Sequence, residues 1–228
     1  LHRVDRRQRQ MCIRDRLVHF DKNGFAYELD AWTGQIIRAD KFVTANWADH
    51  IDLTTGVPVL NPETIAHELQ RTSNICPSPL GGKEFTPAAY SPNTGSFYIP
   101  AINFCSSLEP LEANYIAGSP FMGADIGFAP DFTGGSMKPF GEVVAWDPLT
   151  GTAKWRAAEA SAPLFGGIVV TAGDIIFYGT LDGKFQIRNA TTGALLKTIN
   201  LECGVQGNPI TYLGDDGKQR IAVFSGVG

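Results

Sequence analysis

Residues 145–155 read AWDPLTGTAKW, and this stretch decides the fold. Apolar and polar residues alternate in EVVAWD before the turn and in TAKWRA after it, as they do in strands of a half-buried sheet. Asp147 and Thr150 can bond backbone amides that a tight turn leaves open, and Gly151 supplies the positive φ that the exit from such a turn usually needs. The stretch therefore predicts a β-hairpin, and by itself it indicates no chemistry.

The same turn recurs at two other places in the chain. Its copies lie in ELDAWTGQIIR, with Asp30, Thr33 and Gly34, and in IRNATTGALLK, with Asn189, Thr192 and Gly193. Gly193 follows Gly151 by 42 residues, and Gly34 precedes Gly151 by 117 residues. A repeat of short strands and Gly turns with a period near 42 residues has the length of one four-stranded propeller blade. We therefore expect an all-β fold, a partial β-propeller, whose longer interval holds further blade material and an insertion.

The composition fits a turn-rich globular β protein. The 228 residues are 43% hydrophobic and include 25 Gly and 14 Pro, which argues against disorder. No apolar run approaches the roughly 18 residues that indicate a membrane span. Residues 17–228 carry a net charge of about −8, so nucleic acid is not an expected partner.

The first sixteen residues, LHRVDRRQRQMCIRDR, differ from the rest because they hold six Arg and only two Asp. A basic arm for nucleic acid and an Arg-rich targeting peptide are the functional alternatives. MCIRDR, however, resembles the in-frame translation of a transposase adapter end used in sequencing libraries. We expect residues 1–16 to be non-native and disordered, and residues 17–228 to form the domain.

We also expect the native protein to extend beyond both ends of this sequence. The gene would begin upstream of Leu17, and the final letters FSGVG stop in what reads as the middle of a loop. A propeller closes by pairing its first and last blades, so a partial one leaves an unsealed blade face and unpaired strand edges. The isolated chain should therefore be poorly soluble or aggregate.

From Leu17 onward the chain resembles the C-terminal part of the pyrroloquinoline quinone (PQQ) dependent alcohol dehydrogenases, the eight-bladed quinoprotein propellers that include methanol and ethanol dehydrogenases. The resemblance implies about half of such a propeller, and several stretches carry it in the family's order. They are LVHFDKNGFAYELD, DLTTGVPV, ICPSPLGGKEFTPAAYSPNTGSFYIP, AWDPLTGTAKW, FGGIVVTAGDIIFYGTLDGKF and GNPITY.

The repeat that opened this section is similar to the family's tryptophan docking motif, in which a Trp stacks between adjacent blades. The residues that match the motif are Ala145, Asp147, Thr150, Gly151 and Trp155. Arg38 and Lys197 stand where the other two copies would carry Trp. The resemblance therefore implies a role for this stretch in joining blades.

Lys22, in HFDKNGF, stands where the family presents an Arg or a Lys to the ortho-quinone oxygens of the cofactor. A fixed ammonium there would stabilise the charge that develops on the quinone oxygen as hydride arrives. The alternative is that Lys22 only tips a solvated hairpin turn with Asn23 and Gly24 as its type I′ centre.

Glu84 stands eight residues after Cys76, where family members place an Asn or Asp that bonds the cofactor ring. The resemblance implies a cofactor contact at this position. The carboxylate is longer than in the family, so Glu84 pairing with Lys22 or Lys83 is the alternative.

Phe165, in APLFGGIVVTAG, replaces a Trp that commonly lies at the cofactor's edge in the family. It keeps an aromatic wall and loses the indole donor. Gly166 and Gly167 would let backbone approach the cofactor closely. The alternative reading makes Phe165 the start of a buried strand.

Cys76 and Cys105 lie 29 residues apart, the separation at which family members form a disulfide. The resemblance therefore implies this pairing, which would suit a periplasmic protein, and free buried thiols are the alternative. Cys203 is left over and is expected in the core.

Other candidate groups are few. No metal-ligand spacing joins the histidines, and no dinucleotide or nucleophile-elbow motif occurs. Asp125, Asp131 and Lys138, in GADIGFAPDFTGGSMKPFGE, are expected in a surface loop over one end of the propeller, where substrate or electron-acceptor contacts would lie.

The resemblance implies a periplasmic PQQ-dependent alcohol dehydrogenase that oxidises small primary alcohols to aldehydes, with Ca²⁺ or a lanthanide as its metal and a cytochrome c as its electron acceptor. The resemblance leaves a homodimer open. The catalytic base, an Asp, and the metal ligands are expected upstream of Leu17, so no catalytic or metal-binding residue is assigned here and the chain alone should be inactive. The alternative function is a non-enzymatic scaffold, because outer-membrane assembly lipoproteins use the same propeller repeat without a cofactor.

Overall fold

The computed structural model describes residues 16–119, 123–159 and 161–226, and these parts of the chain are almost entirely β-structure. The predicted non-native segment lies outside the described residues except for Arg16, which begins the first strand. None of the helices in the described ranges is long and apolar enough to cross a membrane.

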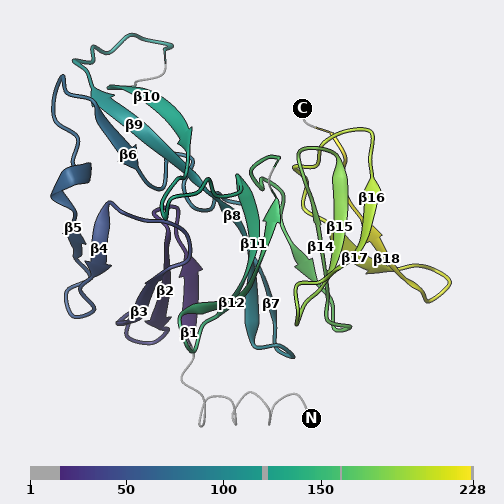
Figure 1. Ribbon diagram of the computed structural model, residues 1–228. Coiled ribbons are helices and arrows are strands. Elements are labelled where there is room, and N and C mark those ends of the chain that lie inside the picture. The colour runs from purple at the N-terminus through teal and green to yellow at the C-terminus, as the bar shows by residue number, and fades with distance from the viewer. Residues whose placement is uncertain (1–15, 120–122, 160, 227–228) are drawn as a thin grey trace.

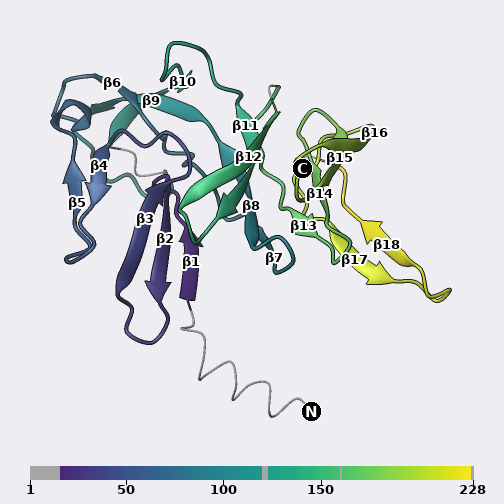
Figure 2. The ribbon, with the colours of Figure 1, turned by 60° about the horizontal axis from the view of Figure 1, so that its bottom comes forward.

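Three antiparallel sheets form the body of the molecule, and Figures 1 and 2 both show them side by side. The first contains β1 (Arg16–Phe20), β2 (Phe25–Asp30) and β3 (Ile36–Lys41). The middle sheet contains β7 (Ala89–Ser91), β8 (Ser96–Ile102), β11 (Gly141–Asp147) and β12 (Thr152–Glu159). The third contains β13 (Val169–Val170), β14 (Ile175–Gly179), β15 (Lys184–Asn189) and β16 (Leu195–Asn200). The expected partial propeller is confirmed.

The remaining elements are smaller and fill the intervals. A two-stranded sheet joins β4 (Ala48–Ile51) to β5 (Pro58–Leu60), and the short 3₁₀ helix η1 (Pro62–Thr64) follows it. A separate sheet orders β10 (Ala124–Pro130), β9 (Phe104–Pro110) and β6 (Thr72–Ile75), and a last hairpin joins β17 (Ile210–Leu213) to β18 (Gln219–Ala222). The long interval between repeats therefore holds the expected insertion.

The inner strands of the middle sheet, β8 and β11, are buried because this sheet packs on both neighbours. Val143 and Val144 point to opposite faces of β11, and both are fully buried. Val143 belongs to a core cluster with Ile176 of the third sheet, and Val144 to one with Phe20 of the first. Residues 143–146, VVAW, are apolar on both faces for this reason, which is typical of a strand covered on two sides, so the alternation expected for this strand is wrong.

The repeated turns share one hydrogen-bond pattern. Asp147 Oδ1 accepts from Leu149 N at 2.9 Å, and the Gly151 amide donates to the Asp147 carbonyl at 2.9 Å. The copies at Asp30 and Asn189 have the same bonds. A further copy of this turn lies at Asp52, between β4 and β5, and has the same bonds.

Trp155 lies at the joint between the middle and third sheets. Its indole N–H donates to the Ala190 carbonyl at 3.0 Å, and its ring centroid is 5.8 Å from that of Tyr98. A Cβ on Gly193 would lie only 2.7 Å from the Trp155 ring. The Trp of one copy therefore packs directly on the glycine turn of the next.

Arg38 occupies the corresponding position at the joint between the first and middle sheets. Its guanidinium donates to the Leu149 carbonyl at 3.0 Å and to the Thr150 carbonyl at 2.5 Å. Asp40 holds the guanidinium from the side at 2.9 Å. An arginine therefore joins the first sheet to the Gly151 turn at the position where the middle sheet carries a tryptophan.

Two expectations about single segments were wrong. GADIGFAPDF is not a surface loop, since residues 124–130 form β10 and Asp131 is only 1% exposed. Cys203 is exposed rather than in the core. It lies in a bend after β16, a strand whose residues are all exposed, so little packs against this end of the third sheet.

Candidate functional site

Lys22 lies in the turn between β1 and β2, at the opposite end of the sheet from the Asp30 turn. The Gly24 amide donates to the Asp21 carbonyl at 3.1 Å, and the Asp21 carboxylate accepts from the Asn23 amide at 2.8 Å. Gly24 has a φ of 92°, whereas Asn23 keeps a negative φ, so the type I′ centre considered for this turn is wrong. The Asp21 side chain stabilises the first part of the turn instead.

The segment 76–88 packs against this turn from far along the chain. The Gly82 amide donates to the Lys22 carbonyl at 2.9 Å, and a Cβ on Gly81 would lie 2.3 Å from Lys22 Cγ. A Cβ on Gly82 would lie 2.4 Å from Val43. The two adjacent glycines are needed here because the turn and the segment approach more closely than any side chain permits.

Glu84 reaches back across this contact to Lys22. Lys22 Nζ lies 2.5 Å from Glu84 Oε1, with 54% of the Lys22 side chain and 26% of the Glu84 side chain exposed. Of the two pairings considered for Glu84, the one with Lys22 is confirmed. Lys83 Nζ donates instead to the Glu84 carbonyl at 3.0 Å. Burial lowers the pKa of the Lys83 ammonium, and the nearby Glu84 charge opposes this shift.

A cavity of about 370 Å³ opens beside Lys22. It is lined by Asp21, Lys22, Asn23, Trp47, Ile75, Pro77, Ser78 and Pro79. The Trp47 indole donates to the Asn23 carbonyl at 2.8 Å and lies edge-on to Phe25, so one wall of this cavity is rigid. The lining surface is mostly apolar, and among its described residues Lys22 is the one cation and Asp21 the one anion.

Phe165 and Gly166 lie in a different segment, just before β13. Gly166 is buried, and a Cβ there would meet three backbone carbonyls at 3.4–3.5 Å. Gly167 is also closely packed against other parts of the protein: its amide donates to Asn208 Oδ1 at 2.9 Å, and a Cβ there would lie 2.7 Å from Pro87. Among the described residues, Phe165 has no hydrogen bond or ring contact with the Lys22–Glu84 pair. Its place at a cofactor edge stays a prediction, as does that of Gly166.

Segment 76–88 nevertheless connects these places. It contacts Lys22 through Gly81 and Gly82, and its Pro87 carbonyl accepts from the Ile168 amide at 3.2 Å. The structure therefore brings Lys22 and Glu84 together directly, and it joins the Phe165 segment to them through Pro87.

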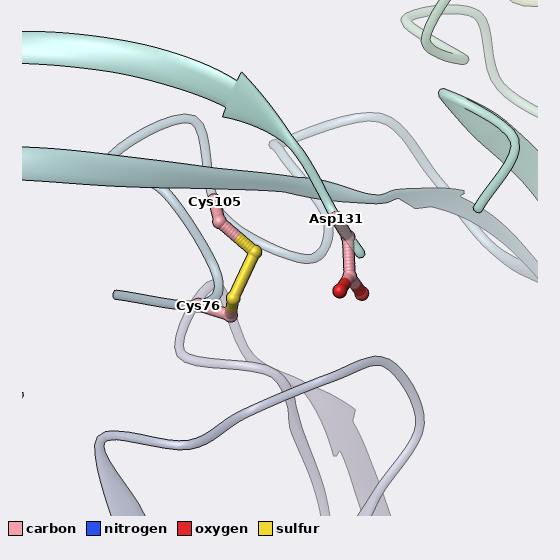
Figure 3. A group of neighbouring side chains, drawn as sticks. All are labelled: Cys76, Cys105 and Asp131. Atoms are coloured by element: carbon pink, nitrogen blue, oxygen red, sulfur yellow. A yellow bond between two sulfur atoms is a disulfide. The ribbon is translucent and has the colours of Figure 1, made fainter. Parts of the chain in front are cut away.

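A disulfide joins Cys76 and Cys105, as the resemblance implied, and anchors the start of segment 76–88 to β9 (Figure 3). Asp131 is the third member of the one group of potential metal ligands found among the described residues. Both sulfur atoms are already bonded to each other, so this group is not a metal site.

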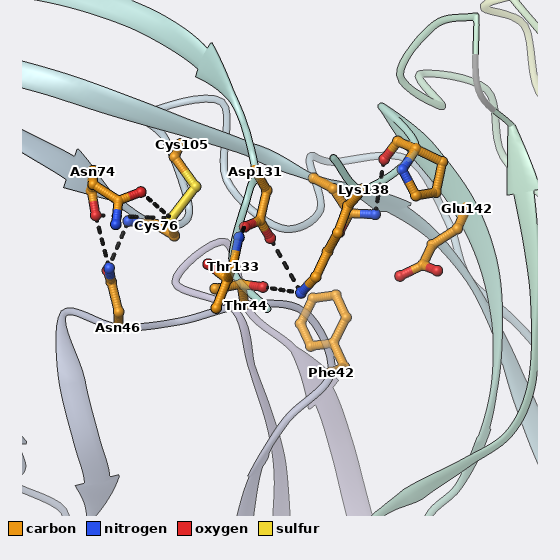
Figure 4. A network of polar contacts seen from close by, with 12 residues as sticks. Phe42, Thr44, Asn46, Asn74, Cys76, Cys105, Asp131, Thr133, Lys138 and Glu142 are labelled. Carbon is orange, nitrogen blue, oxygen red and sulfur yellow. Dashed lines mark hydrogen bonds and ion pairs between the residues drawn. A yellow bond between two sulfur atoms is a disulfide. The ribbon is translucent and has the colours of Figure 1, made fainter. Parts of the chain in front are cut away.

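Asp131 instead holds Lys138, in a network that the sequence patterns did not predict (Figure 4). Lys138 Nζ lies 3.2 Å from Asp131 Oδ2 and donates to the Thr44 hydroxyl, while the Thr133 amide donates to Asp131 Oδ1 at 2.8 Å. Burial would raise the pKa of the Asp131 carboxyl, but the hydrogen bonds from Thr44 and Thr133 and the Lys138 charge outweigh it and hold that pKa below its ordinary value. The network joins the insertion to the connection between β3 and β4.

The comparisons with known proteins agree with this fold. Residues 156–221 match the family model described as the β-propeller domain of glucose, ethanol and alcohol dehydrogenases, which carries the label PQQ. Over 93% of its length the chain is 45% identical to the lanthanide-dependent methanol dehydrogenase of Methylacidiphilum fumariolicum strain SolV. Over 98% it is 35% identical to subunit 1 of the cytochrome c methanol dehydrogenase of Paracoccus denitrificans.

A solved structure of a europium-containing methanol dehydrogenase superposes on 93% of this chain with a TM-score of 0.89 and 45% identity. The matched part is 37% of that structure. Likewise, the chain spans about a third of the length of the curated relatives it matches, 34% and 36% for the two above.

Proposed function

We propose that this chain forms part of an enzyme that oxidises small primary alcohols to aldehydes. The reason is that the chain belongs to the propeller family of the PQQ-dependent methanol and alcohol dehydrogenases. The observation that carries the proposal is the Lys22 side chain. This side chain is more than half exposed, projects from a turn on which Gly81 and Gly82 pack, and lines a cavity of about 370 Å³.

These residues fit a quinone cofactor by their chemistry. A lysine ammonium is a compact cation with three donors, and it suits a planar group whose carbonyl oxygens become negative on reduction. PQQ, when bound, would supply the quinone that accepts the electrons of the alcohol. Lys22 would hold its positive charge against the quinone oxygens.

The proposal extends to partners that relatives suggest. The names of the relatives include lanthanide-dependent and cytochrome c methanol dehydrogenases, and this supports a lanthanide as the metal and a cytochrome c as the electron acceptor. Ca²⁺ is the alternative metal that the resemblance implies. The Cys76–Cys105 disulfide supports an oxidising compartment such as the periplasm. The residues upstream of Leu17 would contribute the catalytic base and the metal ligands.

The test is to titrate the complete protein with PQQ, together with Ca²⁺ or a lanthanide, and then to measure alcohol-dependent reduction of an artificial electron acceptor. We expect the cofactor's absorption spectrum to change on binding and small primary alcohols to be turned over. A correctly folded complete protein that binds no PQQ would support the non-enzymatic scaffold instead.

A further inference from the structure

We propose that Glu84 is a positioning residue, which acts on the reaction by holding Lys22 in place and makes no direct contact with the cofactor. This inference rests on the proposed function, in which the Lys22 ammonium faces the quinone. It follows from a comparison of the Lys22 turn with a second copy of the same turn in the third sheet.

The second copy is the turn between β14 and β15. Its Gly183 amide donates to the Thr180 carbonyl at 3.2 Å, as the Gly24 amide does to the Asp21 carbonyl at 3.1 Å. The carbonyl of each turn's glycine also accepts a similar bond: the Leu201 amide donates to the Gly183 carbonyl, and the Phe42 amide donates to the Gly24 carbonyl. The two turns therefore have the same backbone design.

A glycine from a distant segment packs on the second position of each turn. In the third sheet this position is Leu181, and a Cβ on Gly204 would lie 2.4 Å from its carbonyl oxygen. In the first sheet it is Lys22, on which Gly81 packs. Because Leu181 forms this arrangement without a charge at that position, the close packing does not require a lysine there, nor an ion pair between that position and the packed segment.

The Lys22–Glu84 pair is therefore an addition to a structure that folds without it. A lysine side chain that is 54% exposed would ordinarily sample many rotamers. Here Gly81 lies against the base of the Lys22 stem, and Glu84 binds its tip at 2.5 Å. The Glu84 side chain is 26% exposed, and its backbone carbonyl accepts from Lys83 Nζ at 3.0 Å. Both ends of the Lys22 side chain are thus held, which reduces the cost of placing its charge at one point.

The experiment is a double-mutant cycle in the complete protein loaded with cofactor and metal. We expect Lys22→Met to lower kcat by about 100-fold, because a group that stabilises developing charge is lost. Glu84→Gln should lower kcat by about 10-fold with little change in KM, because the ammonium is still present but is no longer held. In the Lys22→Met background, Glu84→Gln should have no further effect.

The cofactor itself supplies a second readout. The dissociation constant of PQQ, measured by absorption titration without alcohol, should rise in both single variants, and the double variant should match Lys22→Met. If Glu84 bonded the cofactor ring directly, Glu84→Gln would weaken binding further in the Lys22→Met background. Additive losses in either measurement would overturn the inference.

Asp182→Asn is the matched control. Asp182 pairs with Lys184 at 2.5 Å in the second copy of the turn, with side-chain exposures of 28% and 40%. This pair is as short and nearly as exposed as Lys22–Glu84, and Asp182 also accepts from the Thr180 hydroxyl at 2.5 Å. Its loss should therefore disturb the fold at least as much while leaving kcat unchanged. An equal loss of kcat in Asp182→Asn would show a general structural effect and would overturn the inference. A wild-type protein that binds no PQQ would overturn the proposed function as well.

Discussion

Gly193 satisfies two separate constraints at one position. Its φ of 73° is unfavourable for other residues, and its Cα faces the Trp155 ring so closely that a Cβ would lie 2.7 Å away. Gly217, in the turn between β17 and β18, has the same φ of 73° but open space around it. A comparison of Gly193 with Gly217 therefore distinguishes the cost of backbone strain from the cost of disturbing the contact between sheets.

We predict that Gly217→Ala lowers the free energy of unfolding by about 1 kcal/mol, the cost of a left-handed conformation alone. Gly193→Ala should cost about 3 kcal/mol, because the added methyl group must also displace Trp155. Thermal unfolding of the complete protein measures both. Equal costs would mean that Trp155 does not join the sheets through Gly193.

Asp131 is a buried carboxylate whose contribution depends on pH. Its pKa is held below the ordinary value in the folded protein, so the stability that it contributes is present above the unfolded pKa of about 4. This contribution is lost as the pH falls through the folded pKa, because protonation removes the charge that binds Lys138.

We therefore predict that Asp131→Asn lowers the free energy of unfolding by about 2 kcal/mol at pH 7, and that the difference from wild type narrows below about pH 4. Denaturant unfolding at pH 7, 5 and 3 is the measurement. A difference that stays constant down to pH 3 would contradict the assignment of the Asp131–Lys138 pair.

At the scale of elements, the position of the repeat that contacts the neighbouring sheet is occupied by Trp155 in the middle sheet and by Arg38 in the first. Trp155 joins the middle sheet to the third through ring packing and one N–H donor, whereas Arg38 joins the first sheet to the middle one through two carbonyls and Asp40. Apolar packing persists in salt, while contacts of an exposed guanidinium are screened.

We predict that Arg38→Ala costs about 1 kcal/mol in low salt and less in 1 M NaCl, whereas Trp155→Ala costs about 3 kcal/mol in both. Melting temperatures of the two variants against wild type, at both salt concentrations, give the comparison. If salt reduces neither effect or reduces both equally, the two joints do not differ as proposed.

The elements that could be predicted from the sequence are those that repeat. The AWDPLTGTAKW hairpin and the blade spacing follow from local turn chemistry and alternation, and both are present in the structure. The insertion could not be predicted in this way. β6, β9 and β10 pair across long intervals, and the low pKa of Asp131 depends in part on a hydrogen bond from Thr44, which is far away in the sequence. Such contacts leave no periodic pattern.

For the candidate site, the same limit applies. The pairing of Lys22 with Glu84 was one of two alternatives, and only the contact of Gly81 and Gly82 with the turn decides between them. Cys203 was expected inside on residue type alone, and its position after the exposed strand β16 places it at the surface.

At the scale of the whole molecule, the described sheets correspond to part of the propeller of the solved methanol dehydrogenase that the chain matches. The chain spans about a third of the relatives it matches, and the third sheet ends in β16, whose residues are all exposed. The proposed chemistry therefore depends on residues of this chain, above all Lys22, acting together with residues that this sequence does not contain.

The central claim, that this chain brings a cationic side chain to a quinone cofactor, is tested most directly at Lys22. The measurement is alcohol-dependent turnover of the complete, PQQ-loaded protein with Lys22→Met and with Lys22→Arg. We predict a loss of about 100-fold in kcat for Lys22→Met and most of the activity retained in Lys22→Arg, which keeps the charge. Wild-type turnover in Lys22→Met would contradict the account.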